Sequence, residues 1–218
     1  MFLVLMVDQA LKFWVKLHFN LDEYIPRVSD SWYYLHFIEN EGMAFGLTFG
    51  GESGKLVLTL FRIVAVVVIL MILRNMVKQG AGNWQITSMA LILAGALGNI
   101  IDSTFYGLIF SESTQFQRAV LFPPEGGYAP LFHGAVVDML YFPLWEGHFP
   151  SWSPIWSGEY FIFFRPVFNL ADAAITCGVV LLILTHRSAR KQEDPSSAPI
   201  VDPPAVPETP EAPVGTAE

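Results

Sequence analysis

The sequence predicts a mainly α membrane protein with four transmembrane helices, and three observations lead to this fold class. Of its 218 residues, 53% are hydrophobic, and the mean hydropathy of +0.44 is too high for an ordinary soluble domain. Polar, turn-rich sequence separates the apolar segments into an alternating pattern. The apolar segments themselves approach the length of a bilayer span and lie at about residues 1–19, 56–73, 84–102 and 167–185.

The negative charge of the chain is concentrated at its C-terminal end. The formal net charge is −8, and after Lys191 there are six acidic residues and no basic ones. Residues 192–218 are also rich in proline and poor in apolar side chains, so they are predicted to be a disordered cytoplasmic tail. The remaining body, residues 1–191, is close to neutral, and no nucleic-acid partner is expected.

The first apolar segment is interrupted by a possible ion pair. Asp8 and Lys12 lie four residues apart, a spacing at which the two side chains of a helix can pair, although a surface salt bridge is the alternative. Only seven residues precede Asp8, which is about 10 Å of helix, against a hydrocarbon core of about 30 Å. We therefore expect a shortened first span whose natural start lies further upstream.

A small extramembrane subdomain is predicted at residues 20–54. Its segment Tyr33–Ile38 is a candidate strand, and turn-forming sequence follows it. Asn40, two residues before a glycine, fits a plain turn as well as a functional position.

The second and third spans contain one basic residue and one repeat of small residues. Arg62 interrupts the second span, and the sequence leaves open whether its side chain snorkels, lines a cleft or meets a headgroup. In the third span, small residues recur every four positions, which lets another helix approach closely. They are Ala90, Ala94 and Gly98.

Two polar pairs stand at the ends of spans. Asn99 and Asp102 close the third span, while Asn169 and Asp172 open the fourth, and each pair is spaced to share one helix face. An aspartate in hydrocarbon costs roughly 2.5 to 3.5 kcal/mol, so it normally faces a partner or water. One such pair would be an ordinary interhelical hydrogen bond. Two indicate a shared polar pocket at one membrane surface.

The longest extramembrane region is predicted at residues 103–166. Asp138 lies here within an apolar run, and the segment from Trp145 to Phe164 is dense in aromatic residues, as is typical of a segment resting among lipid headgroups. Neither His133 nor His148 has further ligands at metal-binding spacing. No metal or cofactor is expected.

The basic residues predict the orientation in the membrane. Arg74 and Lys78 stand between the second and third spans, and three more basic residues follow the fourth, namely Arg187, Arg190 and Lys191. Because basic residues favour the cytoplasmic side, both termini are predicted there. The two larger extramembrane regions and the polar pocket then face outward.

Asp138 and Asp172 have the best setting for chemistry. Two carboxyls held close together cannot both ionise cheaply, so one keeps a proton while the other acts as a base, as in aspartic proteases. Such a pair can activate water to attack a peptide carbonyl. Taken singly, Asp138 fits an ordinary loop carboxylate and Asp172 a helix N-terminal acid favoured by the helix dipole. Cys177 has no histidine near it in sequence.

Five blocks of this sequence, in the same order, resemble the lipoprotein signal peptidase family, also called signal peptidase II. They are Asp8–Lys12, Asn40–Phe45, Gly95–Asp102, Val136–Asp138 and Phe168–Ile175. The resemblance implies that residues 1–191 form a four-helix aspartyl endopeptidase of the bacterial inner membrane, with a small β-cradle and an active site facing the periplasm. It also implies a monomer, without cofactors, that cuts diacylglyceryl-modified prolipoproteins just before the lipidated cysteine.

The resemblance implies roles for particular residues. Asp138 and Asp172 would be the catalytic dyad. Residues that shape, steady or support the site would be Asn40, Asn99, Asp102, Asn169, Ala171, Asp8 and Lys12. The family usually has arginine after the aspartate of the third span, where this chain has Ser103. Arg118 and Arg165 are the candidates for the missing cation. Two insertions, at about 108–132 and 144–164, flank the Asp138 block.

Two other classes of function remain as alternatives. A proton-coupled carrier would use intramembrane carboxylates as relays, but it predicts carboxylates near the bilayer midplane and paired repeats, whereas here they stand at span ends. A non-catalytic scaffold that binds lipidated partners would carry the two aspartates out of alignment. Membrane lipids are expected partners in every case.

Overall fold

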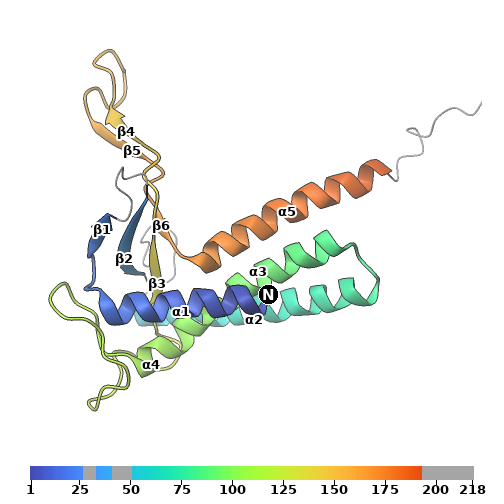
Figure 1. Cartoon of the computed structure of the whole chain (residues 1–218), viewed down its shortest axis with the longest axis horizontal. Helices are drawn as coiled ribbons and strands as arrows, with labels where there is room; N and C mark the ends of the chain where they lie inside the picture. Colours follow the sequence, from blue (N-terminus) through green and yellow to red (C-terminus); the bar gives the residue numbers. More distant parts are fainter. Residues whose placement is uncertain (27–32, 41–50, 193–218) are drawn as a thin grey trace, which may run out of the picture.

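The computed structural model of the chain is shown in Figure 1, and it describes residues 1–26, 33–40 and 51–192. The predicted disordered tail lies outside the described residues from position 193 onward, as does the turn after Asn40. Four long helices dominate: α1 (Phe2–His18), α2 (Gly51–Lys78), α3 (Asn83–Ile101) and α5 (Leu170–Gln192). A mainly helical fold with small antiparallel sheets is thereby confirmed.

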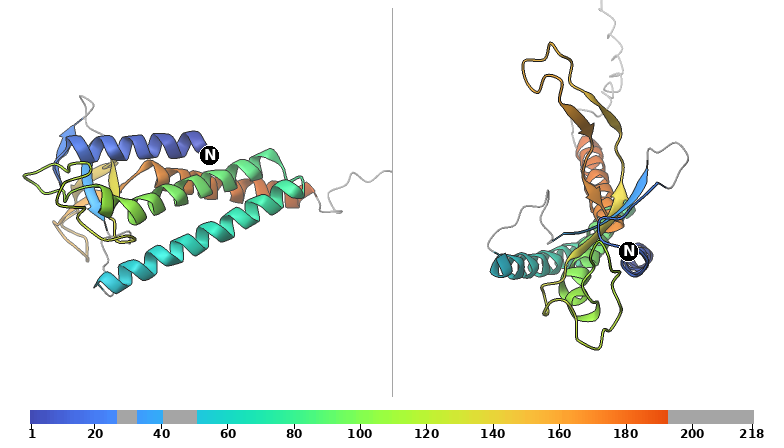
Figure 2. Two further views of the ribbon diagram at one scale, coloured as in Figure 1. Left: turned by 90° about the horizontal axis from the view of Figure 1, so that it is seen from below. Right: turned by 90° about the vertical axis from the view of Figure 1, so that its left-hand side faces the viewer.

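The helices differ in how well each suits a bilayer. Two helical stretches, Ser53–Lys78 and Asn83–Ile109, are long and apolar enough to cross a membrane, while Leu170–Thr185 is a shorter apolar stretch. Helix α1 has 17 residues and buries Asp8 and Lys12, the pair predicted within it, together with Lys16. The axes of the four long helices are roughly aligned, with successive helices running in opposite senses, and the sheet and the longer loops gather at one end of them (Figure 2).

Helix α3 lies at the centre and packs most extensively against α5. A Cβ atom added to Gly95 would lie 2.1 Å from the carbonyl oxygen of Ala171, and one added to Gly98 would lie 2.6 Å from a carboxylate oxygen of Asp8. Larger residues at these two positions would therefore push neighbouring helices apart. This close approach brings three helices together at the level of the polar residues.

The third helix continues past the predicted end of its span at Asp102. A π-helix, η2 (Asp102–Tyr106), and a short helix, α4 (Gly107–Ile109), extend it by two turns. The wider π-turn buries Asp102, Ser103 and Tyr106 together against the rest of the protein. The sequence pattern missed this extension because it is held by distant contacts: Gly134 donates its backbone N–H to the Ser103 carbonyl at 2.8 Å.

A four-stranded antiparallel sheet lies across one end of the helices. Its strands, in spatial order, are β1 (Tyr24–Pro26), β2 (Tyr34–Asn40), β3 (Val136–Tyr141) and β6 (Val167–Phe168). The predicted strand at 33–38 corresponds to β2. In the register, Ile38 faces Asp138 and Asn40 faces Val136, so the last residues of β2 lie beside the first residues of β3. Strand β6 leads directly into α5, which joins the sheet to the bundle.

Strands β4 (Trp145–His148) and β5 (Tyr160–Phe163) form a separate hairpin. It projects away from the helices, across their direction, at the end that carries the sheet (Figures 1 and 2). Its aromatic side chains are largely exposed, with Trp152 at 82%. The insertion predicted at 144–164 is therefore an arm of its own.

The apolar core lies between α1, the extension of α3 and the sheet. Its buried members are Val15, Phe19, Phe37, Tyr106, Phe110, Ala119, Val137 and Met139. Val137 and Met139 point to one face of β3, and the intervening Asp138 points to the other because side chains alternate along a strand. The packing of this core fixes the strand that carries Asp138.

Candidate active site

Asn169 links the two aspartates predicted to act together. It immediately precedes α5, and its Oδ1 accepts the backbone N–H of Asp172 at 2.9 Å, while Asp172 Oδ2 accepts the backbone N–H of Asn169 at 3.4 Å. This reciprocal capping fixes the first turn of α5. The Nδ2 of Asn169 donates to Asp138 Oδ1 at 2.7 Å. The side-chain amide of Asn169 therefore contacts the carboxyl group of Asp138 in β3 and the backbone N–H of Asp172 in α5.

Asp138 is almost completely buried, with 3% of its surface exposed. Asn40 donates a hydrogen bond to Asp138 Oδ2 from the neighbouring strand, so each carboxyl oxygen meets an amide. Burial, followed by the nearby charge of Asp172, raises the pKa of Asp138 to about 8. The hydrogen bond from Asn169 opposes this rise. At neutral pH Asp138 therefore keeps its proton.

Asp172 is less enclosed than Asp138 and stands at the N-terminal turn of α5, where the helix dipole favours a negative charge. Asn99 Nδ2 donates to Asp172 Oδ1 at 2.8 Å. Asn99 Oδ1 in turn accepts from Asn169 Nδ2 at 3.1 Å. The two polar pairs at the span ends thus meet, and they surround one carboxylate with donors.

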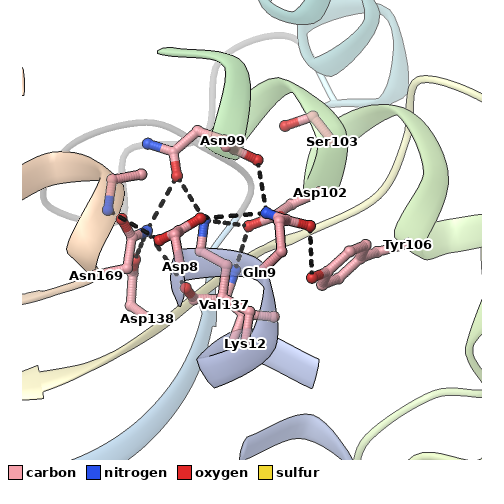
Figure 3. A network of polar contacts seen from close by, with 12 residues as sticks. Asp8, Gln9, Lys12, Asn99, Asp102, Ser103, Tyr106, Val137, Asp138 and Asn169 are labelled. Atoms are coloured by element: carbon pink, nitrogen blue, oxygen red, sulfur yellow. Dashed lines mark hydrogen bonds and ion pairs between the residues drawn. The ribbon is translucent and has the colours of Figure 1, made fainter. Parts of the chain in front are cut away.

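Behind this pair lies a buried ionic cluster (Figure 3). Lys12 Nζ lies 3.0 Å from Asp8 Oδ2 and 2.7 Å from Asp102 Oδ2, and it donates to Asn99 Oδ1 at 2.9 Å. Lys12, Asp8 and Asp102 are each exposed by 1% or less. Asp8 Oδ1 also accepts the backbone N–H of Ala171 at 2.9 Å. The cluster therefore ties α1 to both α3 and α5.

Sequence reasoning missed two members of this cluster. Gln9 Nε2 donates to Asp102 Oδ1 at 3.0 Å and to the Gly98 carbonyl at 3.2 Å, and Tyr106 donates to Gln9 Oε1 at 3.1 Å. Gln9 directly follows Asp8, and Tyr106 lies four residues after Asp102, so both sit beside residues that the sequence did single out. Their role depends on long-range packing, which spacing alone does not reveal.

Ser103 meets a cation that the sequence did not assign to it. Arg62 Nη1 donates to Ser103 Oγ at 3.3 Å, across the contact between α2 and α3. Arg118 and Arg165, the expected candidates, are both exposed side chains on later loops. The sequence left three options open for Arg62, and the structure shows its half-buried side chain in contact with the π-helix that follows α3.

The chemistry of the donor set is that of carboxyls and amides. Among the described residues, no group of three or more His, Cys, Asp or Glu side chains is arranged to hold a metal ion. A protonated carboxyl beside an ionisable one, both oriented by asparagine side chains, can pass protons to and from a water molecule. Fold and site together indicate a class: a helical protein with segments long enough to cross a membrane, in which asparagine side chains link two aspartates as an aspartic protease would require.

Known proteins identify the family within this class. The family model described as "Signal peptidase (SPase) II" matches residues 1–187, and the chain belongs to that family. The lipoprotein signal peptidase of Porphyromonas gingivalis (strain W83) is 50% identical over 185 residues, which cover 84% of this chain and 79% of that protein. The lipoprotein signal peptidase of Amoebophilus asiaticus is 38% identical over 192 residues, covering 87% and 77%.

Solved structures agree on the fold. A bacterial membrane enzyme determined at 2.3 Å resolution superimposes with a TM-score of 0.59 at 20% identity, covering 90% of each chain. A second bacterial membrane enzyme, at 1.9 Å resolution, gives a TM-score of 0.52 at 21% identity, covering 84% of this chain and 87% of that one. The chain is therefore a membrane protease of the signal peptidase II family, and neither a carrier nor a scaffold is favoured.

Proposed function

We propose that Asp138 and Asp172 form the catalytic dyad with which this protease removes signal peptides from diacylglyceryl-modified prolipoproteins, cutting before the lipidated cysteine. The observation that carries the proposal is the bridging by Asn169, whose amide contacts both aspartates where the sheet meets the bundle. The family supplies the reaction, and the geometry supports the assignment of these two residues.

The difference between the two carboxyls suggests their roles. Asp172, the more accessible one, takes a proton from water, whose oxygen attacks the carbonyl carbon before the cysteine. Asp138, which keeps its proton at neutral pH, donates it to the developing oxyanion. The C–N bond then breaks as the proton on Asp172 passes to the leaving amine. One hydroxyl of the gem-diol returns its proton to Asp138, which restores the starting state of the pair. The products are a signal peptide with a new carboxyl end and a lipoprotein with a free cysteine amine.

The remaining predicted residues support the pair in this proposal. Asn99 and Asn169 orient Asp172 and the first turn of α5, and Asn40 holds Asp138 from the sheet. The buried ionic cluster behind them has a structural role, and so does the backbone N–H of Ala171, which binds it. Its charged members are Asp8, Lys12 and Asp102.

We further propose that α1, α2, α3 and α5 all span the bacterial inner membrane. Helix α2 ends at Lys78, and the turn between α2 and α3 lies at the same end of the molecule as the end of α5, opposite the sheet (Figure 2). Basic residues favour the cytoplasm, so both termini would lie there and the dyad would face the periplasm. A lipidated cysteine costs about 0.8 kcal/mol per buried CH₂ to withdraw from the bilayer, so an interfacial site suits this substrate.

Membrane lipids are proposed partners of two surfaces. Helix α2 leaves most of its apolar side chains exposed, and the β4–β5 hairpin exposes Trp145, Trp152 and Trp156. Because the hairpin projects across the helix direction, it would lie along the outer leaflet, where tryptophan is favoured.

A probe on the hairpin tests this placement. In a Cys177→Ser background, which removes the single native cysteine, a fluorophore on Trp152→Cys is expected to be quenched by shallow nitroxide lipids in nanodiscs. The matched control is Glu125→Cys, at an exposed position on the loop after α4, where we expect weaker quenching. Equal accessibility of position 152 to an aqueous quencher with and without lipid would contradict the placement.

The function itself is tested with wild-type protein in nanodiscs that each hold one copy. We expect cleavage of a diacylglyceryl-modified prolipoprotein immediately before the modified cysteine, and no cleavage of the same peptide without lipid. The product masses identify the bond that is cut. Cleavage by single copies would support a working monomer, because one chain contributes every residue of the site. Equal cleavage of both peptides would refute the proposed substrate.

A further inference from the structure

Arg62 lies on α2, the helix that leaves most of its apolar side chains exposed, and its side chain points toward the polar site. Its neighbours on α2 are apolar, and an arginine within such a span normally points to the interior of the bundle or to water. The guanidinium of Arg62 is half-buried and donates to Ser103 Oγ, which is itself buried at 2% exposure. The side chain thus reaches the π-helical turn that follows Asp102.

The charges around Arg62 identify what it faces. The carboxyl groups that interact electrostatically with Arg62 are those of Asp172, Asp102 and Asp138. Ser103, which holds the guanidinium, lies four residues after Asn99, whose Nδ2 donates to Asp172 Oδ1 at 2.8 Å. Asp102 is already paired with Lys12 at 2.7 Å, and Asp138 keeps its proton at neutral pH. The negative charge left for Arg62 to balance is therefore that of Asp172.

We propose that Arg62 is a positioning residue: its positive charge, anchored by Ser103, faces Asp172 and holds the single proton of the dyad on Asp138. This inference rests on the proposed function of the two aspartates. A positive charge near a carboxyl favours its ionised form, and the effect strengthens where water is scarce. Ser103 anchors the guanidinium in the required place.

At position 103 this chain has a small serine, and Arg62 brings a cation to the same place. Ser103 accepts a hydrogen bond from a guanidinium that arrives from α2, whereas a long cationic side chain at 103 would come from η2. The cation is therefore delivered by a different helix. A swap of the two residues, Arg62→Ala with Ser103→Arg, would return it to η2.

A purely mechanical role for Arg62 predicts different behaviour. Thr59, one turn earlier on α2, donates to the Phe132 carbonyl at 3.0 Å and also ties this helix to the loop after α4. Thr59→Val removes such a tie without changing any charge. Arg74→Gln removes an exposed cation from the far end of the same helix. These two variants are the matched controls.

The experiment measures the pH dependence of kcat/KM with the lipidated peptide in nanodiscs. We expect Arg62→Gln to lower kcat/KM about 10- to 100-fold at neutral pH, because a charge-assisted interaction is lost. We also expect the acid limb of its profile to move up by about one pH unit, because the dyad loses a cation that favours ionisation. Arg62→Lys should keep the limb in place, and the swap should restore part of the activity.

The controls separate the possible outcomes. Thr59→Val and Arg74→Gln should leave the acid limb where the wild type has it. An Arg62→Gln enzyme with wild-type kcat/KM, or with a lower rate but an unmoved acid limb, would overturn the inference. Asp138→Asn, assayed alongside, reports on the proposed dyad independently, so failure of the dyad and failure of the Arg62 role give different results.

Discussion

Asp138→Asn and Asp172→Asn are each expected to lower the rate of prolipoprotein cleavage by about 10³-fold or more. Asparagine keeps the shape of the side chain but can neither accept a proton from water nor deliver one to the oxyanion. The hydrogen bonds from Asn40, Asn99 and Asn169 can be kept by the amide oxygen of the new residue on at least one side. The loss should therefore be in kcat rather than in protein yield.

The pH dependence of the wild type should carry the signature of Asp138. Its pKa of about 8 in the folded protein means that cleavage falls as the pH rises through about 8, because the acid of the dyad is lost. The same shift affects stability. An unfolded Asp releases its proton near its ordinary value of 3.8, so folding stability is lost as the pH rises from there toward 8.

Asp138→Asn removes this pH-dependent loss, because its amide does not titrate. We expect the variant to be no less stable than the wild type at pH 8, which thermal unfolding in detergent will measure. The same measurement is the folding control for the loss of cleavage. A variant that is inactive only because it unfolds would leave the catalytic role of Asp138 without support.

Lys12→Met is expected to have the largest effect on folding, about 3–5 kcal/mol, because it leaves buried charge uncompensated. Lys12 is fully buried, and its ammonium group lies between Asp8 and Asp102. Methionine fills a similar volume but cannot balance either carboxylate. Since the cluster joins α1 to α3 and α5, its loss should loosen the whole bundle.

The free energy of unfolding in detergent tests this prediction. Lys78→Met, on the exposed end of α2, is the matched control and should change stability by less than about 0.5 kcal/mol. Adding Asp102→Asn to Lys12→Met should recover part of the loss, because one unpaired carboxylate is removed. A Lys12→Met protein as stable as the Lys78→Met control would show that the cluster does not hold the helices together.

Local patterns were sufficient to predict the helices and the polar pairs. The three-residue spacing of Asn99 with Asp102, and of Asn169 with Asp172, follows directly from helix geometry. Side-chain spacing also predicted the Asp8–Lys12 pair, which the structure forms at 3.0 Å. Periodicity works here because each of these relations lies within one helix.

Relations between distant segments were beyond such patterns. The sheet joins β2 to β3, although about a hundred residues separate them, and no local signal sets that register. The π-helical turn after Asp102 depends on packing against the loop near Gly134. The contact of Arg62 with Ser103 joins two helices, and the sequence favoured cations on later loops instead. Each of these features is fixed by tertiary contacts.

The central claim is that Asp138 and Asp172 act as one catalytic unit. Cleavage rates of Asp138→Asn, Asp172→Asn and the double variant, measured side by side with the lipidated peptide, test it most directly. Because residues that act as a unit have non-additive effects, all three should retain the same residual rate. Cleavage at more than about a tenth of the wild-type rate by either single variant, or a double-variant loss equal to the product of the single losses, would contradict the account.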